Sequence, residues 1–218
     1  KKNYKTTPAT SVTALNDLPG SNQKSIWFNS RFFRTNLLWD NGVLRFRDIH
    51  LFDENMTSLY LNEKGTSNQC LYFTLPFVDG YFWSSAEKMG GLYFKATENG
   101  QEIVLHGEEL SASNPEKGTL EVKWKLDNGH GTFLLSMNEN NLTIEFSNDK
   151  KLDWYLDLEV ALNSELPFTT ISAAKVGMTF SAVNYEVNAL AGNFSDSENR
   201  KAFRITPEQN KIVLNFSN

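Results

Sequence analysis

The chain has 218 residues, a formal net charge of −5 and a sequence pI near 5.3. An acidic surface repels phosphate backbones, so this charge balance argues against nucleic-acid binding. Hydrophobic residues make up 40% of the chain and aromatic residues 13%, which is ample for a packed core and excludes a disordered chain. The longest apolar stretch, residues 71–78, is far short of the roughly 20 residues of a membrane helix, so no spanning segment is expected.

The first part of the chain is polar and rich in Ser, Thr and Asn. Residues 1–24 contain no apolar signal core and are typical of the flexible start of a mature exported protein. We therefore expect a tail over residues 1–24, a single domain over residues 25–218, and location in the periplasm, at the cell surface or outside the cell. No linker rich in Pro, Gly or Ser divides residues 25–218.

Strand and turn signals then follow one another to the end of the chain. Apolar and polar residues alternate with period two over residues 120–126, 142–146, 154–162 and 212–216. Hairpin turn signals separate such runs at residues 40–42, 99–100, 127–129 and 138–141. The stretches with any helical character, 84–89, 108–113 and 195–201, are two turns at most. The pattern predicts an all-β fold, a large two-sheet antiparallel sandwich.

The alternation also predicts which side chains form the core. The apolar positions of the clearest strands should face inward, since successive side chains of a strand point to opposite faces. The expected core includes Trp124, Leu126, Leu142, Ile144, Phe146, Trp154, Leu156, Leu158 and Val160.

The segment from Asp79 to Gly91 is the most suggestive of binding. It places three consecutive aromatic residues between glycines, and aromatic faces are common platforms for sugar rings. If the segment is extended, Tyr81 and Trp83 share one side and form the platform, while Phe82 points inward. Asp79 and Glu87 supply hydrogen-bond acceptors. The alternative is that the three rings plug the end of the sandwich.

Three further groups of residues are candidate functional sites. Trp39 and Asp40, just ahead of an Asn-Gly turn, form a second candidate ligand-binding pair. Asp157 and Glu159 lie two apart on one predicted strand, where they are either a carboxylate pair for glycoside chemistry or solvated residues of an outward face. The adjacent carboxylates at 108–109 are expected on a surface turn.

No motif indicates a metal or cofactor. His50, His106 and His130 do not form an HxH or HxxxH pair, and the lone Cys70 has no partner at ligand spacing. The glycine pair at 90–91 lacks the context of a nucleotide-binding loop, and no GxSxG sequence is present. We therefore expect no metal site and no cofactor.

Part of the chain resembles a known family. Residues 29–34, then 37–40 with the Asn41-Gly42 turn and residues 43–46, and finally residues 52–57, resemble the opening of a galactose-mutarotase-like β-supersandwich domain. The run 154–160 resembles one of the long central strands of that fold. Such domains precede the catalytic domain in several glycoside hydrolases.

The resemblance implies a carbohydrate-related function in an exported bacterial polysaccharide-degrading system. It implies a non-catalytic carbohydrate-binding or accessory domain, or the N-terminal domain of a glycoside hydrolase whose catalytic domain lies beyond this chain. The alternative is a small sugar-active enzyme, a hydrolase, lyase or epimerase, with carboxylates on a concave sheet face. Epimerases of this fold use a histidine in an HPYFN-like segment that is absent here, so no histidine is carried over as catalytic.

Overall fold

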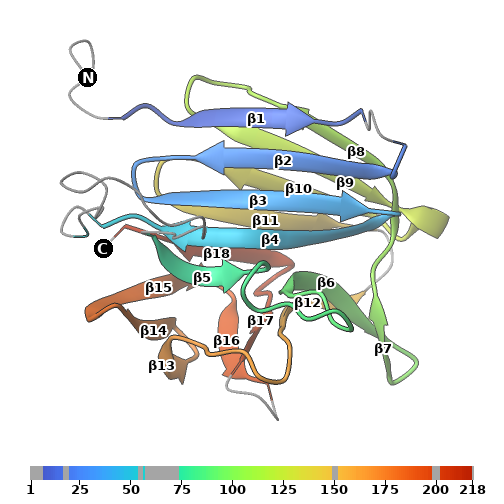
Figure 1. Ribbon diagram of the computed structural model, residues 1–218. Helices are drawn as coiled ribbons and strands as arrows, with labels where there is room; N and C mark the ends of the chain where they lie inside the picture. The colour runs from blue at the N-terminus through green and yellow to red at the C-terminus, as the bar shows by residue number, and fades with distance from the viewer. Residues whose placement is uncertain are drawn as a thin grey trace.

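The computed structural model describes residues 7–16, 20–53, 56, 74–148, 152–197 and 202–217. These residues form an all-β sandwich of two antiparallel sheets, so the predicted fold class is confirmed. Figure 1 shows strands β1 to β4 lying in front of the layer that contains β8 to β11. Among the described residues, no helix is long and apolar enough to cross a lipid bilayer.

The first sheet has ten strands in the described part of the chain and follows the order β1-β2-β3-β4-β6-β12-β17-β16, with β5 paired to β4 and β7 paired to β6. Its strands are β1 (Thr10–Ala14), β2 (Gln23–Asn29), β3 (Phe33–Asp40), β4 (Val43–Leu51), β5 (Leu75–Asp79), β6 (Gly91–Glu98), β7 (Gln101–Val104), β12 (Asp153–Glu159), β16 (Asn193–Asp196) and β17 (Phe203–Thr206).

Over the same described residues, the second sheet has eight strands in the order β13-β14-β15-β18-β11-β10-β9-β8. Its strands are β8 (Gly107–Ser113), β9 (Leu120–Leu126), β10 (Thr132–Met137), β11 (Asn141–Ser147), β13 (Phe168–Ser172), β14 (Lys175–Phe180), β15 (Val183–Ala191) and β18 (Lys211–Asn215). A 3-10 turn over Asp127–Gly129 joins β9 to β10.

The predicted turns fall between consecutive strands. Asn41 and Gly42 connect β3 to β4, and Asn99 and Gly100 connect β6 to β7, all four with positive φ. Asn and Gly tolerate this left-handed backbone better than other residues, which is why these dipeptides specify tight hairpins.

Every residue of the predicted core is buried, with at most 6% of its surface exposed. Trp124 and Phe133 come from the second sheet, and Phe94 and Trp154 come from the first. The ring centroids of Phe94 and Phe133 lie 5.0 Å apart, and those of Phe133 and Trp154 lie 4.9 Å apart. These contacts join the two sheets.

Several local expectations are wrong. Residues 108–113, considered as a short helix and in part as a turn, belong to strand β8. The β12 strand ends at Glu159, so Leu162 is 83% exposed rather than continuing the buried row. Residues 84–89 form a loop, and Ser195 belongs to β16.

The sheet also begins earlier than the boundary expected at residue 25. Within the segment assigned to the tail, β1 pairs with β2, and Gln23 and Lys24 already belong to β2. Residues 1–6, Cys70, residues 198–201 and part of the 52–57 segment lie outside the described residues.

We expect Trp124→Ala and Trp154→Ala each to lower the free energy of unfolding by about 3–5 kcal/mol, because each leaves a cavity in the aromatic contact between the sheets. Urea denaturation followed by circular dichroism measures this loss. A loss below about 1 kcal/mol for either variant would show that its ring is not packed in the core.

Candidate functional site

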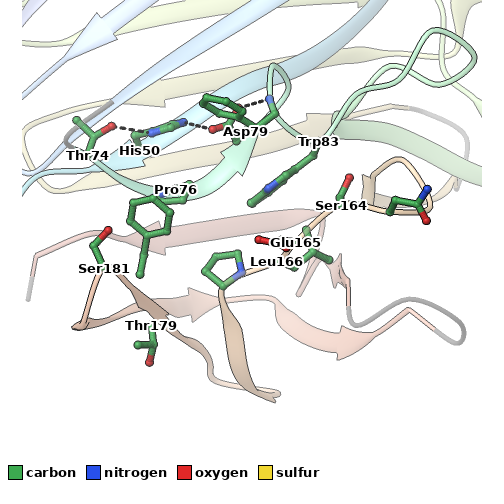
Figure 2. Close-up of a pocket in the computed structure, with 14 residues that line it drawn as sticks. His50, Thr74, Pro76, Asp79, Trp83, Ser164, Glu165, Leu166, Thr179 and Ser181 are labelled. Carbon is green, nitrogen blue, oxygen red and sulfur yellow. Dashed lines mark hydrogen bonds and ion pairs between the residues drawn. The ribbon is translucent and has the colours of Figure 1, made fainter. Parts of the chain in front are cut away.

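A cavity of about 600 Å³ lies beside the end of β5, where the β5–β6 loop faces the segment after β12 and the β14–β15 turn. Figure 2 shows Trp83, Glu165 and Leu166 on one side of this cavity, with Pro76 and Ser181 across from them. Its lining combines aromatic rings with hydrogen-bonding groups. The lining residues are His50, Thr74, Pro76, Asp79, Phe82, Trp83, Asn163, Ser164, Glu165, Leu166, Pro167, Thr179, Phe180 and Ser181.

A buried His–Asp pair forms one wall of the cavity. His50 and Asp79 are 2% and 4% exposed, and Nε2 of His50 lies 3.6 Å from Oδ2 of Asp79. On the other edge of the ring, Nδ1 of His50 is 2.8 Å from the Thr74 hydroxyl oxygen (Figure 2). The Thr74 contact fixes the ring so that Nε2 faces Asp79.

Burial determines the charge of this pair. It lowers the pKa of His50 to about 3, assisted by the nearby positive charge of Arg34, so the imidazole is neutral at neutral pH. Burial also raises the pKa of Asp79, while the backbone N–H groups of Phe82 and Tyr81 act in the opposite direction. The nearby Asp48 carboxylate raises the pKa of Asp79 further.

The register of the sheet brings these residues together. His50 lies on β4, and β5 pairs with it so that Asp79 is directly opposite Asp48. Asp48 and His50 are two residues apart on β4 and therefore project from the same face. This is the face of the first sheet that points away from the second sheet, which we call the outer face.

Asp79 also organises the loop that follows it. Its Oδ1 accepts hydrogen bonds from the N–H groups of Tyr81 and Phe82 at 3.0 and 2.9 Å, which is an Asx-type turn. Residues 80–83 therefore form a turn and not a strand. Ser84 closes the loop, because its hydroxyl donates to the carbonyl of Gly80 and accepts from the N–H of Gly90.

The turn changes the orientation of the three aromatic residues. Tyr81 and Phe82 are 66% and 56% exposed, whereas Trp83 is 3% exposed and packs against Phe168. The expectation that Phe82 points inward while Tyr81 and Trp83 form an exposed platform is therefore wrong. Trp83 and Phe82 both line the cavity, and Tyr81 is absent from its lining.

The other three predicted binding residues, Glu87, Trp39 and Asp40, do not line this cavity. Glu87 is exposed and lines a neighbouring cavity of about 470 Å³, which shares Phe82, Asn163 and Ser164 with the first. Trp39 is buried, and Asp40 is the last residue of β3, just before the turn to β4. Trp39 is five residues along β3 from Arg34, the register partner of His50, or about 17 Å away. The structure does not bring Trp39 and Asp40 to the cavity.

The carboxylate pair on β12 belongs to an ion network. Lys95 on β6 is 4% exposed, and its ammonium group lies 2.9 Å from Asp157 Oδ2 and 2.7 Å from Glu102 Oε1, in addition to a contact with Glu159. Asp157 is 8% exposed, so the expectation of a solvated residue is wrong at this position. Arg204 contacts Asp157 as well, at 3.1 Å.

The Lys95 network is ill suited to acid catalysis. Burial alone would raise the pKa of Glu159, but hydrogen bonds from Lys88 and Lys95 outweigh it and lower that pKa. The pKa of Glu102 is lowered in the same way, through Lys95 and the Tyr155 hydroxyl. A glycosidase acid needs a raised pKa instead, so these carboxylates act as ionised partners of the lysine.

Comparisons with protein-family models, curated proteins and solved structures found no match to this chain. Its function must therefore be inferred from its own geometry. Sequence reasoning missed His50 and the polar residues Asn163, Ser164 and Glu165 of the cavity lining. The signal available for His50 was the Asp48-x-His50 spacing on a predicted strand.

We expect Lys95→Met to lower the free energy of unfolding at neutral pH by about 3–5 kcal/mol, because the buried Asp157 and its two neighbouring glutamates lose their shared cation. The loss should shrink as the pH falls below about 4.5. Protonation then removes the charges of the carboxylates that have lost Lys95 in the variant. Over the same range the wild type loses the stability that its lowered carboxyl pKa values provide at higher pH.

Urea denaturation between pH 3 and pH 7 measures both effects, and Lys123→Met, which changes an exposed lysine on β9, is the matched control. A loss independent of pH would show that the network does not act through its charges.

Proposed function

We propose that this chain binds carbohydrate in the cavity beside β5. The observation that carries the proposal is the combination of aromatic and hydrogen-bonding groups around one space of about 600 Å³. Sugar rings place C–H groups on aromatic faces and hydroxyls against carboxylates and amides, and most small-molecule cavities measure about 300–1,000 Å³. Trp83 and Phe82 supply the rings, and Asn163, Ser164 and Glu165 supply polar groups.

The neighbouring cavity favours a chain of sugars over a single one. Phe82, Asn163 and Ser164 belong to both linings, and Glu87 and Lys88 extend the polar lining beyond them. A ligand that crosses Phe82 would therefore contact both spaces. Ala161 donates a hydrogen bond to the carbonyl of Trp83 at 2.8 Å, which ties the two walls together before any ligand binds.

A role in an exported polysaccharide-degrading system, as an accessory domain or as the N-terminal domain of a glycoside hydrolase, agrees with such a site. The support for this setting is the resemblance of the early strands and turn to supersandwich domains. The bound partner is then an oligosaccharide or polysaccharide.

We expect Phe82→Ala to weaken binding of the preferred glycan by about 5- to 150-fold, the equivalent of ~1–3 kcal/mol for an aromatic contact. Tyr81→Ala is the matched control. Tyr81 is the neighbouring exposed ring and does not line either cavity, so its loss should change affinity less than twofold. A glycan array identifies the ligand, and calorimetric titration measures the affinities.

Thermal melts should be nearly unchanged for both variants, because both rings are more than half exposed. Absence of any glycan bound by the wild-type chain would contradict the proposal. Equal affinities of Phe82→Ala and the wild type would show that the ligand does not occupy the cavity.

A second candidate function is catalysis on a sugar. The observation that favours it is the neutral, buried imidazole of His50, which lines the same cavity as Asp79 and Glu165. Incubation of the wild-type chain with its bound glycan should then release new reducing ends or unsaturated products. Glu165→Gln should reduce that release if the Glu165 carboxylate takes part. Absence of products with every bound glycan would contradict catalysis.

A further inference from the structure

Three potential ligand groups converge beneath the cavity from two neighbouring strands. Asp48, His50 and Asp79 are each more than 90% buried, and one donor atom from each lies within 4.8 Å of the other two. Asp48 and His50 leave β4 on the same side, and Asp79 is the register partner of Asp48 on β5. The set joins one imidazole nitrogen with two carboxylates.

The placement of two carboxylates opposite each other is costly without a cation. Like charges directly across an antiparallel pair repel, and burial strengthens the repulsion because water is excluded. Hydrogen bonds to Tyr81 and Phe82 occupy Oδ1 of Asp79, and Oδ2 faces His50. A proton or a metal ion between the carboxylates would relieve the repulsion.

Asn36 gives an independent indication of a cation. This residue is 0% exposed, and its amide nitrogen donates to Ser25 and Ile26 on β2. Its Oδ1 accepts no hydrogen bond within the described part of the chain. Because Nδ2 is directed to β2, Oδ1 is turned toward β4, where Asp48 is the register partner of Asn36. A buried acceptor beside carboxylates is stabilised by a positive charge.

The environment of His50 agrees with the pattern of metal-bound histidines. Such a ring usually holds its second nitrogen with a hydrogen-bonding partner that fixes its orientation, and Thr74 occupies that position at 2.8 Å from Nδ1. The distance of 3.6 Å between Nε2 and Asp79 Oδ2 is too long for a good hydrogen bond. A single ion can span this distance, because Zn²⁺ lies about 2.0–2.2 Å from nitrogen and carboxylate ligands.

We propose that Asp48, His50 and Asp79 bind a divalent transition-metal ion, with Asn36 as an additional oxygen donor. A mixed nitrogen and oxygen set suits Zn²⁺ or Mn²⁺. His50 and Asp79 also line the cavity, so the ion has an open coordination position toward it. A water molecule or an oxygen of a ligand in the cavity can complete the shell. This proposal departs from the sequence-based expectation of no metal, which rested on motif spacing alone.

Two guanidinium groups weaken the site. Arg47 Nε lies 3.1 Å from Asp48 Oδ2, and Arg34 is the register partner of His50. Their charges oppose a divalent ion and should weaken its binding. The side chain of Arg47 is 36% exposed, however, and can turn to solvent when the ion binds.

Calorimetric titration of the chelator-treated wild-type chain with ZnCl₂, and separately with MnCl₂, tests the proposal. We expect one equivalent of at least one ion to bind, and binding to raise the melting temperature. His50→Gln and Asp79→Asn should each weaken binding by 10-fold or more. Asparagine retains an oxygen for the Tyr81 and Phe82 hydrogen bonds, so the loop should persist. His106→Gln, at an exposed histidine, is the control and should bind as the wild type does.

Binding of neither ion would overturn the proposal, as would unchanged affinity in folded His50→Gln and Asp79→Asn variants or an equal loss in His106→Gln. If these variants do not fold, electron spin echo spectroscopy of the wild-type chain decides. Mn²⁺ bound at this site should show modulation from an imidazole nitrogen, and its absence would overturn the proposal. Glycan binding is measured separately in the presence of chelator, so failure of the metal site and failure of sugar binding are distinguishable.

Discussion

Contact between aromatic rings of the two sheets is the interaction on which the structure depends. Phe94 and Trp154 of the first sheet interlock with Trp124 and Phe133 of the second, with centroid separations of 4.9–5.5 Å in the contacts between neighbouring rings. Large rings bury much apolar surface per residue and pack in few geometries, so they hold the sheets at one spacing. Each of these strands then packs one face into the core. The functional residues of the protein must therefore lie on the other face of a sheet or in the loops.

The outer face of the first sheet is unusual because it buries polar residues. Asp48, His50, Lys95 and Asp157 are all less than 10% exposed there. These polar residues are brought to their neighbours by strand pairing and not by proximity in the sequence. Asp157 is the register partner of Tyr93 and Arg204, and Asp48 is the register partner of Asp79. A shift of one residue in any of these pairings would send the polar side chains into the core, so the same register that packs the rings also fixes the polar groups.

The sequence pattern predicted the structure correctly where hydrophobic periodicity alone determines which side chains are buried. In residues 120–126 each apolar side chain is buried as the alternation predicted, and the Asn-Gly dipeptides form the turns. It failed at residues 80–83, because the Asp79 carboxylate binds two backbone N–H groups and replaces strand alternation with a turn. The Asp48-x-His50 spacing was visible, but its partner Asp79 comes from a strand that pairs with β4 only after a long connection. No local pattern encodes that pairing.

The two polar groups on the outer face differ in how their charge is balanced. Glu102, Asp157 and Glu159 surround the Lys95 ammonium, a cation that the chain itself supplies at the centre of the group. The group next to Asp48 and Asp79 is the neutral imidazole of His50 and not an ammonium group. The Arg47 guanidinium contacts Asp48. A group whose central position is filled by a tethered lysine is complete and serves stability. In the His50 group, the metal ion that we propose would supply the central charge. This group also borders a cavity, which makes it the better candidate for function.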